Sequence, residues 1–80
     1  MKDFVSNSGY QITVEVYRTS VKCPEQAKAL VQLLLSYFPT SEINFDLDDC
    51  DKILRVKHRD PPVRSISGIL MERGFLCEEL

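Results

Sequence analysis

The chain has 80 residues, of which 44% are hydrophobic and 28% charged, and its formal net charge is −2. This length allows one domain with a modest core. The charge argues against nucleic acid as a partner, because phosphates are bound by clustered Lys and Arg side chains, and no apolar run reaches the roughly 18 residues of a membrane span.

Residues 1–9 are mostly polar and end in Ser8-Gly9. We expect a flexible N-terminal segment over 1–9 and a single domain over 10–80. The first residues lack the apolar region of a secretory signal, so we expect a cytoplasmic protein. In that compartment Cys23, Cys50 and Cys77 would be reduced thiols rather than disulfides.

Residues 11–17 alternate between apolar and polar side chains, which predicts a half-buried strand. The β-branched residues Ile12, Val14 and Val16 form one set, and Thr13, Glu15 and Tyr17 form the other. We expect the aliphatic set to face the core. Residues 19–22 then form a short loop.

A helix is predicted from about Cys23 to the residue before Pro39. Pro24 suits the first helical turn, and Glu25 complements the positive end of the helix dipole. The apolar residues recur at helical spacing and form one stripe: Ala27, Leu30, Val31, Leu34 and Phe38.

Two further strands are predicted at 42–47 and 53–57, joined by the acidic turn 48–51. A second helix is predicted over about 62–73, with Val63, Ile66, Ile69 and Leu70 inward. Gly74 then occupies the place of a left-handed helix cap. A last short strand is expected over 75–79.

The element order is therefore β-α-β-β-α-β, which predicts an α+β, ferredoxin-like fold. In this fold two helices cover one face of a four-stranded antiparallel sheet. The covered face is expected to take Ile12, Val14, Val16, Ile43, Phe45, Leu47, Leu54 and Val56. The open face is expected to show Thr13, Glu15, Tyr17, Asn44, Asp46, Ile53, Arg55 and Lys57.

This topology brings all three cysteines to one end of the domain. Cys23 lies at a helix start, where the dipole favours a thiolate, and is the best candidate for a functional thiol. Cys77 is expected to point into the core, and Cys50 to be exposed in its turn. His58, the single histidine, is expected to be solvated at the opposite end, away from Cys23.

The segment 20–26 (SVKCPEQ) resembles the metal loop of heavy-metal-associated domains, the family of copper chaperones and of the N-terminal domains of metal-transporting ATPases. That family carries Gly-Met-x-Cys-x-x-Cys between its first strand and first helix. Cys23 lies at the first ligand position, and Gly74-Phe75 matches the glycine-aromatic pair before the last strand. Gln26 occupies the second ligand position, and an amide is a poor ligand for soft metals.

Two functions follow as hypotheses. The first is a non-catalytic binding module that contacts a protein partner or a second copy through the sheet face, an edge strand or the Cys23 end. The second, implied by the resemblance, is a divergent domain that handles Cu(I) or Zn through Cys23, with Cys77 or the Cys23 of a second chain as the further thiol. An enzyme is not expected, because no nucleophile has a visible base.

Overall fold

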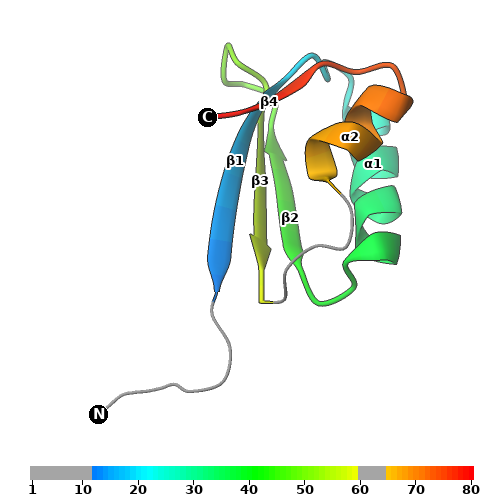
Figure 1. Ribbon diagram of the computed structural model, residues 1–80. Helices are drawn as coiled ribbons and strands as arrows, with labels where there is room; N and C mark the ends of the chain where they lie inside the picture. The colour runs from blue at the N-terminus through cyan, green and yellow to red at the C-terminus, as the bar shows by residue number, and fades with distance from the viewer. Residues whose placement is uncertain (1–11, 60–64) are drawn as a thin grey trace.

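The computed structural model describes residues 12–59 and 65–80. The expected flexible segment 1–9 lies outside these ranges. The elements follow the order β1 (Thr13–Thr19), α1 (Pro24–Tyr37), β2 (Glu42–Asp46), β3 (Ile53–His58), α2 (Ile66–Glu72) and β4 (Cys77–Glu79). The strands form one antiparallel sheet in the order β2-β3-β1-β4, with both helices on the same side (Figure 1). The predicted ferredoxin-like α+β fold is confirmed.

The strand register decides which residues face the helices. Tyr17 of β1 pairs with Leu54 of β3, and Leu54 pairs in turn with Phe45 of β2. Residues directly opposite each other in antiparallel strands share one face of the sheet. Leu54 is fully buried and Tyr17 is 4% exposed, so this row of side chains lies under the helices.

The prediction for the two faces of β1 is wrong. Tyr17 and Thr19 are buried, whereas Ile12 and Val14 are more than half exposed. The alternation is present, but its phase in the sheet is shifted by one residue, which exchanges the two faces. The reason lies outside the strand: the pairing with β3 places Tyr17 beside Leu54 on the covered side.

The other strands follow the prediction more closely. Leu54 and Val56 are buried, and Ile43, Phe45 and Leu47 pack against the core as half-buried side chains. Ile53 has its predicted position on the open face, opposite Arg18, but it is 5% exposed rather than solvated. The long side chain of Arg18 extends from that neighbouring position toward Asp51 and Glu78.

Helix α1 buries the stripe that the sequence predicts except for Val31, which is half-buried. Ala27, Leu30 and Leu34 are buried along its inner side, and Phe38 follows at its end. Pro24 is its first residue, where the missing backbone N–H removes no helical hydrogen bond. No helix in the described ranges is both long and apolar enough to cross a membrane.

Helix α2 begins at Ile66, directly after Ser65. Ser65 has an extended backbone, and its hydroxyl accepts a hydrogen bond from the Gly68 N–H, which makes it the N-cap. The predicted start at Pro62 and the inward Val63 lie outside the described residues. Ile66, Ile69 and Leu70 are buried as expected. Gly74 has φ of 88°, the left-handed conformation expected after the helix.

Candidate functional site

Three loops meet at one end of the domain, as the topology predicts (Figure 1). The Thr19 N–H donates to the Asp51 carbonyl oxygen of the β2-β3 hairpin at 3.1 Å. The Ser20 N–H donates to the Leu76 carbonyl oxygen before β4 at 3.2 Å. These backbone hydrogen bonds hold the β1-α1 loop between the two other loops.

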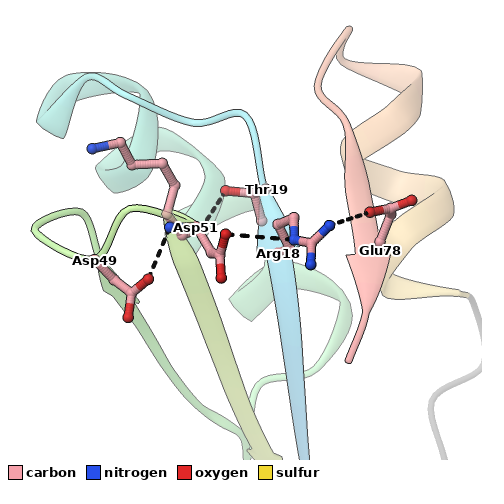
Figure 2. A network of polar contacts seen from close by, with 6 residues as sticks. Arg18, Thr19, Asp49, Asp51 and Glu78 are labelled. Carbon is pink, nitrogen blue, oxygen red and sulfur yellow. Dashed lines mark hydrogen bonds and ion pairs between the residues drawn. The ribbon is translucent and has the colours of Figure 1, made fainter.

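A polar network joins the same three segments (Figure 2). The Arg18 guanidinium lies 3.6 Å from the Asp51 carboxylate and 3.3 Å from the Glu78 carboxylate. The Thr19 hydroxyl donates to the Lys52 carbonyl oxygen at 2.6 Å. The ion pairs are about half exposed, so each contributes little to stability. The buried Thr19 contact is the stronger link between β1 and the hairpin.

Cys23 is the residue directly before α1 and is partly exposed. Its thiol donates a hydrogen bond to the Glu25 carboxylate, with 2.8 Å between the sulfur and Oε1. This hydrogen bond lowers the pKa of Glu25. The loop therefore presents an accessible thiol that is engaged by a neighbouring carboxylate.

Cys77 lies on the first residue of β4 and is buried in the hydrophobic core, as the sequence predicts. Burial, with a smaller contribution from the negative charge of Glu79, raises the pKa of the Cys77 thiol to about 11. At neutral pH this thiol is protonated. Because soft metals bind the thiolate, metal binding at Cys77 carries the cost of deprotonation and exposure.

Cys50 is exposed in the β2-β3 hairpin, as expected. Its sulfur and the carboxylates of Asp49 and Asp51 lie within 4.8 Å of one another. Both carboxylates have contacts within the fold. Asp49 accepts the Asp51 N–H at 2.8 Å, and Asp51 pairs with Arg18. These contacts account for the cluster as the polar turn that the sequence predicts.

A polar cluster lies on the covered face of the sheet, where Tyr17 of β1 and His58 of β3 are buried. The Tyr17 hydroxyl donates to the Glu15 carboxylate at 2.6 Å, and His58 Nε2 lies 3.6 Å from the same oxygen. Burial, followed by the hydrogen bond and charge of Glu15, raises the pKa of Tyr17 well above its usual value. His58 is 6% exposed, so the prediction of a solvated histidine is wrong.

Sequence reasoning missed this cluster because its members come from two strands far apart in the chain. His58 reaches Glu15 because it pairs with Thr13 at the end of β3, on the covered face. The cluster follows from the same shift of β1 that exposes the aliphatic residues. Within the strand itself, the alternating pattern fits either face equally well.

The open face of the sheet carries an aliphatic stripe along β1. Val14 is 57% exposed and Val16 is half-buried. Leu80 donates its N–H to the Val16 carbonyl oxygen and is 62% exposed beside it. On the neighbouring strand β3, the exposed residues Lys57 and Arg55 lie directly opposite Val14 and Val16. The face thus combines exposed aliphatic groups with a basic row.

Comparison of the chain with models of protein families, with curated proteins and with solved structures finds no match.

Proposed function

We propose that this domain is a non-catalytic protein-binding module that binds its partner through the open face of the sheet. The observation that carries the proposal is the exposure of Val14 and Leu80 on a face that the helices leave uncovered. Exposed aliphatic residues gathered on one surface and rimmed by polar groups are typical of protein contact sites. The expected partner has an apolar patch that packs on β1.

The basic row on β3 defines the orientation of this partner. Arg55 and Lys57 border the aliphatic stripe on one side. A carboxylate on the partner would lie over this row while its apolar residues cover Val14 and Val16. Such rim charges contribute to specificity and association rate more than to affinity.

The described thiol contacts support a role without catalysis. Cys23, the accessible thiol near the loops, bonds to Glu25, whose pKa that hydrogen bond lowers. A carboxylate of lowered pKa is a weak base for activating a thiol. His58, the single histidine, lies buried on β3 and is near Glu15 rather than Cys23.

The test is site-specific cross-linking from the open face. Two variants of the chain are made. One carries a photoreactive amino acid in place of Val14, and the other carries it in place of Ala29, an exposed residue of α1. We expect the first to cross-link a defined partner that the second does not. The partner is then purified, and its affinity is measured for the wild type and for the Val14→Lys and Ala29→Lys variants.

We expect Val14→Lys to weaken binding at least tenfold, because a charge would be buried in the contact, and Ala29→Lys to leave it unchanged. A partner that binds both variants as well as the wild type would remove the open face from the proposal. Cross-linking of the same proteins from position 14 and from position 29 would also contradict binding through the open face. Sedimentation of the wild type and Val14→Lys distinguishes a second copy from a different protein.

A second candidate function is soft-metal binding at Cys23. It is favoured by the accessible position of Cys23 between β1 and α1, where heavy-metal-associated domains carry their first cysteine ligand. The buried, protonated Cys77 weighs against the two-thiol form of this hypothesis.

Titration of the reduced protein with Cu(I) against a competing chelator tests this second function. Binding through Cys23 requires that Cys23→Ser lose at least tenfold in affinity. The matched control is Cys50→Ser, which replaces another accessible cysteine. Equal affinities of the wild type and Cys23→Ser would exclude Cys23 as a ligand.

A further inference from the structure

A groove of about 310 Å³ lies between α2 and β4 and reaches around the edge of the sheet to Arg18 and Glu78 on the open face. Its lining includes Met71 of α2 and Leu76, Cys77 and Glu78 at the sheet edge. Met71 is 59% exposed and Leu76 is 71% exposed. The groove therefore offers apolar contact area directly beside an edge strand.

The backbone of β4 is oriented to accept another strand along this edge. β4 is the outermost strand of the sheet. The Leu80 N–H donates to Val16, and the Leu76 carbonyl oxygen accepts from Ser20, so these residues direct their backbone groups toward β1. In an antiparallel ladder this direction alternates from residue to residue. The backbone groups of Cys77 and Glu79 therefore point outward.

Carboxylates lie on both faces of this edge. Glu78 pairs with Arg18 on the open face and has a side chain 70% exposed. Glu79 is opposite Tyr17 on the covered face and is also exposed. The negative charge of Glu79 adds to burial in raising the pKa values of both Tyr17 and Cys77. With the Arg18 guanidinium offsetting Glu78, the two carboxylates and one guanidinium leave this edge with a net negative charge.

These charges disfavour a second copy paired at Glu78 or at Glu79. Antiparallel pairing of two β4 strands centred on Glu78 would place two Glu78 side chains directly opposite each other. Pairing centred on Glu79 would do the same with Glu79. Like charges opposite each other destabilise a strand pair, a common means of preventing edge-to-edge association. The same carboxylates favour a basic strand.

We infer that the β4 edge and its groove bind an extended, basic segment of another protein, which adds to the sheet as an antiparallel fifth strand. Its side chains follow from the positions along β4. Two adjacent basic residues lie opposite Glu79 and Glu78, one on each face. The residue opposite Cys77 lies on the covered face, toward Met71 of α2, and the aliphatic residue that follows it packs against Leu76. Backbone hydrogen bonds supply affinity, and the alternate side chains supply specificity.

The experiment uses the full chain and a fluorescent peptide, TVKRTLTVT, followed by anisotropy. We expect saturable binding that weakens as salt is raised. The peptide TVEETLTVT, with reversed charge, should bind at least tenfold more weakly. The peptide TVKRPLTVT should also lose at least tenfold, because proline removes the N–H that would bond to the outward backbone of Cys77.

Two variants of the protein locate the binding edge. Glu79→Lys should weaken binding of TVKRTLTVT at least tenfold. Glu42→Lys makes the same charge change at an exposed position on β2, the other edge of the sheet, and should change binding less than twofold. Met71→Ser should weaken binding about threefold. Circular dichroism and urea midpoints confirm that each variant is folded before its affinity is interpreted.

The inference is overturned if the wild type does not bind TVKRTLTVT, if the proline peptide binds equally well, or if Glu79→Lys and Glu42→Lys have the same effect. Its failure is separable from that of the proposed function. Val14→Lys should leave peptide binding intact, because Val14 lies away from the groove lining. A partner lost by Val14→Lys while the peptide fails to bind would uphold the open face and reject the β4 edge.

Discussion

The two faces of β1 carry the reverse of the side chains that polarity alone would assign. The covered face holds Glu15, Tyr17 and Thr19, and the open face holds Val14 and Val16. The covered polar groups are satisfied within the fold: Tyr17 bonds to Glu15, and Thr19 bonds to the Lys52 carbonyl oxygen. The aliphatic side chains of Val14 and Val16 lie on the face of the sheet that is turned away from the helices.

This contrast separates stability from function within one strand. Buried polar groups are tolerated when each has a hydrogen-bond partner, and they then favour one register over its alternatives. Exposed valines add little to folding, so their place on the surface is better explained by a contact with another molecule.

The largest effect is expected in the core beneath the helices. Leu54→Ala should lower the free energy of unfolding by about 2–5 kcal/mol, because it removes a fully buried side chain and leaves a cavity. Urea unfolding measures the change. Arg55→Ala, the adjacent exposed position on the same strand, is the control and should change stability by less than about 0.5 kcal/mol. Similar losses at both positions would contradict the assignment of faces.

The buried hydroxyl of Thr19 should contribute the next largest effect. Thr19→Val removes the hydrogen bond to Lys52 and the one accepted from the Val21 N–H. We expect a loss of about 1–3 kcal/mol, since the two backbone groups remain buried without this partner. Thr13→Val is the matched control, because Thr13 is exposed on the same strand. A neutral Thr19→Val variant would show that the contact is dispensable.

The raised pKa of Cys77 predicts a loss of stability in alkaline solution. The unfolded thiol releases its proton near its ordinary pKa of 9.0, while the folded thiol keeps it up to about 11. Between pH 9 and pH 11 the unfolded state binds fewer protons than the folded state. The contribution of Cys77 to the free energy of unfolding is therefore complete below pH 9 and is lost as pH rises toward 11.

Urea unfolding under reducing conditions tests the contribution of Cys77. The wild type should lose more stability than Cys77→Ala between pH 9 and pH 11. The pKa of Tyr17 is raised by burial and by Glu15 in both proteins, so the difference between them reports mainly on the thiol. If the stability of the two proteins falls in parallel with pH, burial does not raise the pKa of Cys77.

The smallest effect is expected on the open face. Val14→Thr should change the free energy of unfolding by less than about 0.5 kcal/mol, because the added hydroxyl remains in water. Val56→Thr makes the identical change on the covered face and should cost about 1–3 kcal/mol. If both valines respond alike, the open face is not the solvated surface proposed for binding.

The fold and its elements could be predicted from local patterns. Helical spacing predicts the stripe of α1 from Ala27 to Leu34. A glycine directly after a helix predicts the turn at Gly74, which has the expected positive φ. The Ser65 hydroxyl caps α2 just before Ile66, and the predicted start at Pro62 lies outside the described residues.

The candidate sites were harder to predict. The meeting of the three loops follows from topology, and the buried position of Cys77 was expected. The open aliphatic face and the groove beside β4 were not, because the first depends on the register of β1 and the second on the contact of α2 with β4.

The alternation along β1 determined by itself that a strand would form, because period-two patterning fits an extended chain whichever way it faces. Only the tertiary structure decided which set of side chains lies inside. That choice depends on partners that are distant in the sequence. Tyr17 lies opposite Leu54, Thr19 bonds to the Lys52 carbonyl oxygen, and Glu15 lies near His58. A strand has two faces of equal geometry, and the free energy that distinguishes them comes from the neighbours that each face meets.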